Sequence, residues 1–127
     1  MQRTQIIMGM PITVTVHGTN ASTLINDSFD YFRLVDERYS TYKSDSEISR
    51  INKGLPEAEW SQEMKTVLDL CEDTRKATDG YFNISHNGKI DPSGLVKGWA
   101  IYNAAKRLKR QRVMNFCIEA GGDIQCQ

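Results

Sequence analysis

One short run of alternating apolar residues constrains the fold of this chain more than any other feature. Residues 12–16 read Ile-Thr-Val-Thr-Val, and this period of two predicts a strand with one buried face. A second strand-like segment, residues 5–8, precedes it, and Gly9 and Pro11 mark a bend between the two. The chain therefore begins with two neighbouring strands, whose apolar face needs other elements to cover it.

Helical spacing takes over after these strands. Apolar residues three to five positions apart predict helices at about residues 22–39, 46–52, 61–79 and 95–108. Ser61 is a suitable cap for the third helix, and one of Ser44, Asp45 and Ser46 for the second. The residues expected on the buried faces of the two long helices before residue 80 are Leu24, Phe29, Phe32, Val35 or Asp36, Met64, Val67, Leu68 and Cys71.

Further strands are predicted towards the carboxyl end. Residues 81–85 and 89–90 are strand or loop segments around a hairpin turn at 86–88, and residues 115–119 and 124–126 are strands around a turn at 120–123. We expect an α+β fold, with helices packed on a largely antiparallel sheet. An unpaired last strand would leave the sheet edge open, so we expect either an incomplete domain or partner strands that come from another polypeptide. Pairing between two copies at that edge would give a homo-oligomer.

Length and charge limit the classes of function. A chain of 127 residues suits one domain with a sizeable core. Sixteen basic residues balance sixteen acidic ones, which gives no electrostatic signal for nucleic acid or anionic lipid. No apolar run reaches the roughly 20 residues of a membrane span, and neither a signal peptide nor a lipobox is visible. We therefore expect a cytoplasmic protein without a membrane span.

The three cysteines form no metal-binding pattern. Cys71 lies on an apolar helix face and Cys117 in an apolar strand, while Cys126 is near the end of the chain. No C-x-x-C spacing is present, so a zinc site is not expected. The interpretation is buried thiols in a reducing compartment.

The segment 90–100 joins a loop to a helix and carries groups that suit a phosphorylated ligand. Asp91, two glycines and Lys97 lie where backbone N–H groups at a helix start and a positive charge can face anionic oxygens. The order of residues is not that of a P-loop or of the G-x-G-x-x-G dinucleotide fingerprint. The alternative is a loop leading into an amphipathic helix with a solvated lysine.

Five segments in order carry a resemblance to a known family. They are Met8-Gly9-Met10, the stretch Tyr39 to Asn52 with its Ser-Glu-Ile-Ser-Arg-Ile-Asn run, Thr78-Asp79-Gly80-Tyr81-Phe82-Asn83, the stretch Asp91 to Ala100, and Ala120-Gly121-Gly122-Asp123-Ile124. Together they resemble the amino-terminal half of the ApbE family, the FAD:protein FMN transferases formerly called thiamine biosynthesis lipoproteins. The resemblance implies that residues 1–127 are the amino-terminal part of a single T-fold-like ApbE domain.

The same resemblance implies a reaction. Family members use Mg²⁺ and split FAD at its pyrophosphate, so that FMN passes to a threonine or serine hydroxyl of a target flavoprotein and AMP leaves. Metal ions and positioning carry most of such a phosphoryl transfer. Hydrolysis of FAD to FMN and AMP, and flavin binding without catalysis, are the alternatives. The family's carboxyl-terminal half supplies an acid-rich metal segment, so we expect this chain alone to be inactive.

The resemblance also implies site residues. The positions that match FAD-contacting residues are Met8, Tyr42, Tyr81, Phe82, Asn83, Asp91 and Lys97. Gly94 matches the position that gives a backbone oxygen to magnesium, and no catalytic residue is implied. Asp91 would serve as a buried carboxylate that bonds a ribose or adenine group. Asn83 stands where aspartate is usual, which keeps a hydrogen-bonding side chain but loses a charge.

Other polar residues have plainer interpretations. The segment 121–123, Gly-Gly-Asp, is either a tight turn that brings backbone close to the ligand or an ordinary hairpin turn. A structural ion pair or helix cap is the expected use of Glu47, Ser49, Arg50 and Asn52. His17 and His86 have no partners at metal or triad spacing, so no function is assigned to them.

Overall fold

The computed structural model describes all 127 residues and divides them into two compact units. Unit 1 consists of residues 1–36 and 97–127, and unit 2 consists of residues 37–96. The chain leaves unit 1 within the helix α1 (Ala21–Tyr39) and returns to it within the helix α4 (Ser93–Arg110). The assignment of the whole chain to a single domain stays a prediction.

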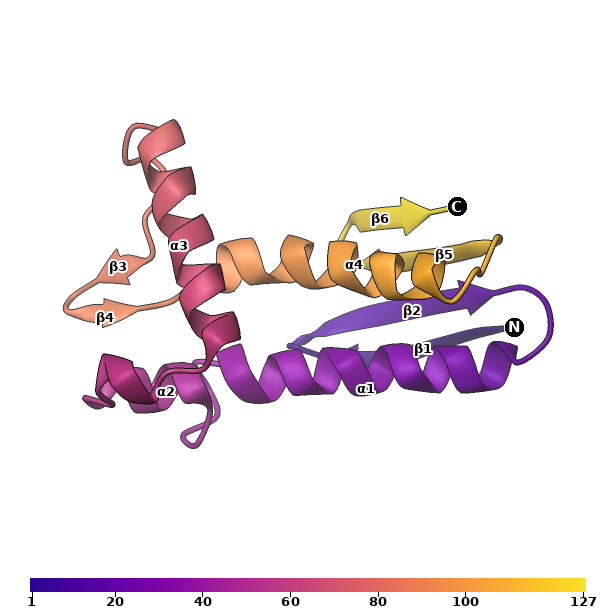
Figure 1. The fold of residues 1–127 in the computed structure, drawn as a ribbon, viewed down its shortest axis with the longest axis horizontal. Coiled ribbons are helices and arrows are strands. Elements are labelled where there is room, and N and C mark those ends of the chain that lie inside the picture. Colours follow the sequence, from indigo (N-terminus) through magenta and orange to yellow (C-terminus); the bar gives the residue numbers. More distant parts are fainter. The chain divides into compact units, whose positions relative to one another are not determined.

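Unit 1 is built on a four-stranded antiparallel sheet (Figure 1). Its strands are β1 (Gln2–Ile7), β2 (Met10–Val16), β5 (Phe116–Ala120) and β6 (Asp123–Cys126), in the order β1-β2-β5-β6. All three neighbouring pairs are antiparallel. The alternating apolar residues of β2 form the buried face that the sequence predicts, because Ile12, Val14 and Val16 are all fully buried. The predicted α+β fold with an antiparallel sheet is confirmed.

Helices α1 and α4 lie along one face of this sheet (Figure 1). Their buried residues within unit 1 are mostly apolar and recur at helical spacing: Ile25, Phe29, Phe32 and Val35 on α1, and Ala100, Ile101, Ala104, Ala105 and Leu108 on α4. Leu24 was expected in the core but is only half-buried. Ile25 takes its place, because Ile25, Phe29 and Phe32 are spaced by four and three residues and so share one face.

Unit 2 contains two α-helices, one short 3-10 helix and a small hairpin. These are α2 (Glu47–Asn52), the 3-10 helix η1 (Glu57–Glu59), α3 (Gln62–Ala77), and β3 (Ser85–His86) paired with β4 (Lys89–Ile90). Ser46 caps α2 by accepting from the Ser49 N–H, and Ser61 caps α3 by accepting from the Met64 N–H, both at 3.1 Å. Both caps are among those that the sequence predicts. Residues 81–84 lie outside any strand, so the first hairpin strand is shorter than predicted.

The cysteines differ from the prediction in one respect. Cys71 is a buried thiol, as expected. Cys117, predicted to be a buried thiol as well, instead forms a disulfide with Cys126, which lies directly opposite it on β6. The antiparallel register places the two side chains on the same face of the sheet, a proximity that sequence spacing alone does not reveal. Because disulfides persist mainly in oxidising environments, the cysteines no longer argue for a reducing compartment.

None of the helices is both long and apolar enough to cross a membrane.

Candidate functional site

Unit 2 contains a pocket of about 440 Å³ between α2, the segment before it and the β3–β4 hairpin. Its lining combines one aromatic ring with hydroxyl, amide and charged side chains: Thr41, Tyr42, Ser44, Ser49, Asn52, Lys53, His86, Lys89, Ile90 and Asp91. We call this the α2 pocket. Tyr42 and Asp91, which the resemblance implies as FAD contacts, thus lie around the same cavity. Ligand pockets in proteins typically measure roughly 300–1,000 Å³, so its size suits part of a nucleotide.

Tyr42 presents its ring to solvent. Its side chain is 99% exposed, an unusual state for a large aromatic residue. The segment that carries it is fixed at Ser40, whose carbonyl oxygen accepts bonds from the hydroxyls of Ser46 at 2.6 Å and Ser49 at 3.3 Å. The Tyr42 N–H donates to the Ser40 hydroxyl at 3.2 Å. A held backbone with an uncovered ring is an arrangement suited to stacking on a planar ligand.

Asp91 ends the hairpin and begins the turn into α4. Its N–H donates to the Ile84 carbonyl at 2.8 Å, and its carboxylate accepts from the Ser93 N–H at 3.0 Å. The side chain is exposed, so the expectation of a buried carboxylate was wrong. The reason is local: a carboxylate that satisfies N–H groups at a helix start must lie at the end of the helix, where water also reaches it. Its second oxygen can still accept a bond from a ligand.

A buried carboxylate connects the helices of unit 2. Glu47, at the start of α2, accepts from the Ser61 N–H at 2.6 Å and the Ser61 hydroxyl at 2.8 Å, and the Arg38 Nε lies 3.3 Å away. The structural use that was predicted for Glu47 is confirmed. Arg38 also pairs with Glu63 at 2.9 Å. The Tyr39 hydroxyl donates a hydrogen bond to the Glu63 carboxylate. Burial and the negative charge of Glu63 raise the pKa of the Tyr39 phenol, so the phenol stays neutral.

The remaining unit 2 candidates lie outside the α2 pocket lining. Asn83 lines a different cavity, of about 350 Å³, with residues of α3 that include Cys71 and Arg75. Its side-chain oxygen accepts from the Ser85 N–H at 2.9 Å. An aspartate would make the same bond, so the departure at this position leaves the turn intact. The side chain of Tyr81 is 95% exposed.

Phe82 and Gly94 lie close together at the start of α4. A Cβ atom added at Gly94 would lie 3.4 Å from the Phe82 ring. Gly94 is the second residue of α4, where carbonyl oxygens accept bonds within the helix. The chain brings together no group of three His, Cys, Asp or Glu residues that could hold a metal ion. The residues present therefore do not fit a magnesium ion by themselves, because this ion requires several oxygen ligands.

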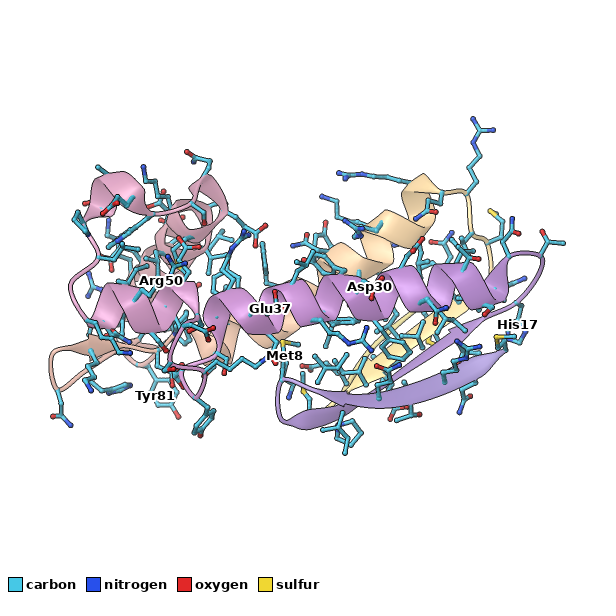
Figure 2. All side chains as sticks on the ribbon, turned by 90° about the horizontal axis from the view of Figure 1, so that it is seen from below. Met8, His17, Asp30, Glu37, Arg50 and Tyr81 are labelled. Carbon is cyan, nitrogen blue, oxygen red and sulfur yellow. A yellow bond between two sulfur atoms is a disulfide. The ribbon has the colours of Figure 1, made fainter.

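Unit 1 gathers its own candidates at one end of the sheet. Met8 lies in the β1–β2 turn (Figure 2), with φ of 57°, an uncommon value for a residue other than glycine. The pairing of Ile12 with Ala120 places the turn at 121–122 at the same end. There the Lys97 ammonium donates to the Gly121 carbonyl oxygen at 3.1 Å. His17 lies at the opposite end of the sheet (Figure 2).

Comparisons with known proteins identify the family. The model of the ApbE family matches residues 8–88 and 84–127. The chain belongs to the ApbE family. No match was found among curated protein sequences.

Solved structures of ApbE proteins share the fold. The flavin transferase ApbE from Vibrio cholerae is similar with a TM-score of 0.87 and 18% identity, over 100% of this chain and 59% of that one. The flavinyl transferase ApbE of Pseudomonas stutzeri, in its apo form, is similar with a TM-score of 0.83 and 18% identity, over 100% of this chain and 60% of that one. The ApbE protein of Thermotoga maritima is similar with a TM-score of 0.84 and 18% identity, over 99% of this chain and 58% of that one. The chain thus spans about 60% of the length of these ApbE structures.

The α2 pocket also contains residues that the sequence did not single out. His86 was set aside as isolated, and Lys53, Lys89 and Asn52 were given no ligand role, yet all four line the pocket with Asp91. The hairpin turn predicted at 86–88 pointed to two of them, because it places His86 and Lys89 opposite one another. In this ApbE chain, the pocket therefore has more positive side chains than the family motifs alone suggest.

Proposed function

We propose that this protein is a flavin transferase that moves FMN from FAD to a threonine or serine hydroxyl of a target flavoprotein and releases AMP. Membership of the ApbE family supports the proposal, as does the fold shared with the flavin transferases of Vibrio cholerae and Pseudomonas stutzeri. The observation that carries it is the α2 pocket, where Tyr42 and Asp91 lie around one cavity of nucleotide dimensions.

The chemistry of this pocket suits FAD. The exposed ring of Tyr42 can stack on a flavin or adenine ring, and burying such a ring on binding is favourable. Asp91 can accept hydrogen bonds from a ribose hydroxyl or an adenine amino group. The ammonium groups of Lys53 and Lys89 offset the charge of a pyrophosphate. Lys53 already donates to the Ser44 carbonyl at 3.1 Å, and an ammonium has three protons to donate.

The other residues that the resemblance implies as FAD contacts lie outside the α2 pocket lining. Met8 holds a strained backbone conformation, and such strain is often retained at functional positions. Tyr81 adds a second exposed aromatic ring. Lys97 acts through the turn at Gly121, to which its ammonium is bonded. Phe82 and Asn83 shape the segment that leads into the hairpin.

In the proposed transfer, the acceptor hydroxyl oxygen attacks the phosphorus of the FMN half. A new P–O bond forms to the threonine or serine, the bridging P–O bond of the pyrophosphate breaks, and AMP leaves with the electron pair of that bond. The hydroxyl proton passes to a base that is not assigned. Magnesium dependence is part of the proposal through the family resemblance. Beyond the Gly94 carbonyl, any ligands of the ion would come from residues other than those described here.

The test is a flavin-transfer assay on the complete protein. We expect FAD, Mg²⁺ and an acceptor flavoprotein to give a fluorescent covalent band and one AMP per flavin transferred, and chelation of Mg²⁺ to abolish both. Tyr42→Leu and Asp91→Asn each lower kcat/KM at least tenfold, while Tyr102→Leu, at an exposed tyrosine of unit 1, has less than a twofold effect. Free FMN with AMP would show a pyrophosphatase instead. Flavin binding without AMP release would show a non-catalytic carrier.

A further inference from the structure

Asn52 forms a pair of hydrogen bonds with the backbone of Ile90. Its side-chain nitrogen donates to the Ile90 carbonyl oxygen at 2.9 Å, and its side-chain oxygen accepts from the Ile90 N–H, also at 2.9 Å. Asn52 is the last residue of α2, and Ile90 is the last residue of β4. The amide of one side chain therefore bonds β4 in the way that an adjacent antiparallel residue would.

This pair fixes an element that has little else to order it. The β3–β4 hairpin has two residues in each strand, and an isolated two-stranded hairpin of any length is at best marginally stable in water. Asp91 follows Ile90 directly, so the position of the Ile90 backbone determines where the Asp91 carboxylate can lie. His86 and Lys89, which also line the α2 pocket, belong to the same hairpin.

Helix α2 thus holds two sides of the pocket. Ser49 donates to the Ser40 carbonyl on the side of Tyr42, and Asn52 bonds Ile90 on the side of Asp91. Both α2 residues also line the cavity themselves. The sequence predicted only a structural cap or ion pair for these positions.

We propose that Asn52 is a positioning residue, which sets the place of Asp91 and of the hairpin for the flavin nucleotide. The inference rests on the proposed function and adds a residue to its site. Asparagine is suited to this task because its amide carries a donor and an acceptor side by side. Aspartate keeps only the acceptor, and leucine, of similar shape, keeps neither.

The experiment compares Asn52→Leu and Asn52→Asp with Trp60→Phe in the complete protein. Trp60→Phe removes another side-chain bond to backbone in unit 2, from Trp60 Nε1 to the Leu55 carbonyl at 2.9 Å, and Trp60 is not part of the pocket lining. The dissociation constant for FAD is measured by flavin fluorescence, and the protection of each backbone amide by hydrogen exchange. Urea unfolding measures the free energy of unfolding of each variant, so that a loss of FAD binding can be separated from a loss of stability.

We expect Asn52→Leu to weaken FAD binding about tenfold and Asn52→Asp about threefold, with Trp60→Phe within twofold of the natural protein. Amide exchange should become faster at Ile90 and Asp91 in both Asn52 variants. FAD binding by folded Asn52→Leu that is as tight as in the natural protein overturns the positioning role. If Asn52→Leu does not fold, Asn52→Asp decides by the same criterion.

A failure of the proposed function gives a different result. In that case the natural protein itself does not bind FAD, whereas the exchange measurement still reports on Asn52. Unchanged protection at Ile90 and Asp91 in the Asn52 variants then overturns the inference on its own, and a local loss of protection there supports the structural half of it.

Discussion

The carboxylate of Glu47 accepts hydrogen bonds from both the backbone N–H and the hydroxyl of Ser61, at 2.6 and 2.8 Å. Glu47 is the first residue of α2, and Ser61 is the cap of α3. One buried carboxylate therefore ties together the starts of two helices, and one of these, α2, forms part of the pocket lining. The helix that lines the pocket is thus hydrogen-bonded to the start of the helix that follows it.

Replacing Glu47 should therefore be costly. We expect Glu47→Ala to lower the free energy of unfolding by about 2 to 4 kcal/mol, because it leaves the Ser61 N–H and hydroxyl without their acceptor and Arg38 with Glu63 as its remaining partner. Glu57→Ala, at an exposed acid in η1, should change it by less than about 0.5 kcal/mol. Urea unfolding measures both. Equal effects of the two substitutions would contradict the role given to Glu47.

Gly121 should not tolerate a side chain. Its φ is +53°, and an added Cβ would lie 2.6 Å from the Lys97 ammonium nitrogen and 3.1 Å from the Met10 sulfur. We expect Gly121→Ala to destabilise the protein by about 1 to 3 kcal/mol, through backbone strain and displacement of Lys97. Gly98→Ala, in the helix α4 with open space around it, should be neutral or stabilising by up to about 1 kcal/mol. Thermal unfolding of both variants checks the contrast.

The disulfide between Cys117 and Cys126 can be tested by counting the free thiols of the chain. After unfolding without reductant, a thiol reagent should label one cysteine per chain, Cys71, and none in Cys71→Ala. Reduction should lower the free energy of unfolding by about 2 to 3 kcal/mol, as chain entropy predicts for a short closed loop. Three labelled thiols per unreduced chain would show that the pairing is absent.

Cys71 should give the stability a dependence on alkaline pH. Burial raises the pKa of its thiol to about 11, so the folded state resists ionisation more than the unfolded chain does. This contribution is complete below the unfolded pKa, near 9, and is lost as the pH rises through about 11. Relative to Cys71→Ala, the natural protein should lose stability across this window. Parallel curves of unfolding free energy against pH for the two proteins would exclude the effect.

Local signals predicted the elements well. The period of two at residues 12–16 identified β2, and Ser46 and Ser61 marked the starts of α2 and α3. These predictions succeed because strand alternation and helix capping are decided by residues a few positions apart. The choice of Leu24 over Ile25 for the core was wrong for a related reason, since a spacing of three to five residues leaves the exact helix face open by one position.

Pairings between distant residues were beyond such signals. Nothing in the spacing of Cys117 and Cys126 indicates a disulfide until the register of β5 and β6 places them opposite each other. Likewise, Asn52 looked like a helix-end residue until the fold brought Ile90 within hydrogen-bonding distance of its amide.

The sequence alone determined the order of elements, the antiparallel hairpins and the family, because each of these depends on local periodicity, turn residues or motifs in fixed order. Only the tertiary structure decided which chemical groups share a cavity. Tyr42 and Asp91 both line one pocket, whereas Asn83 lines another. These positions are set by packing and hydrogen bonds between segments that are far apart in the chain.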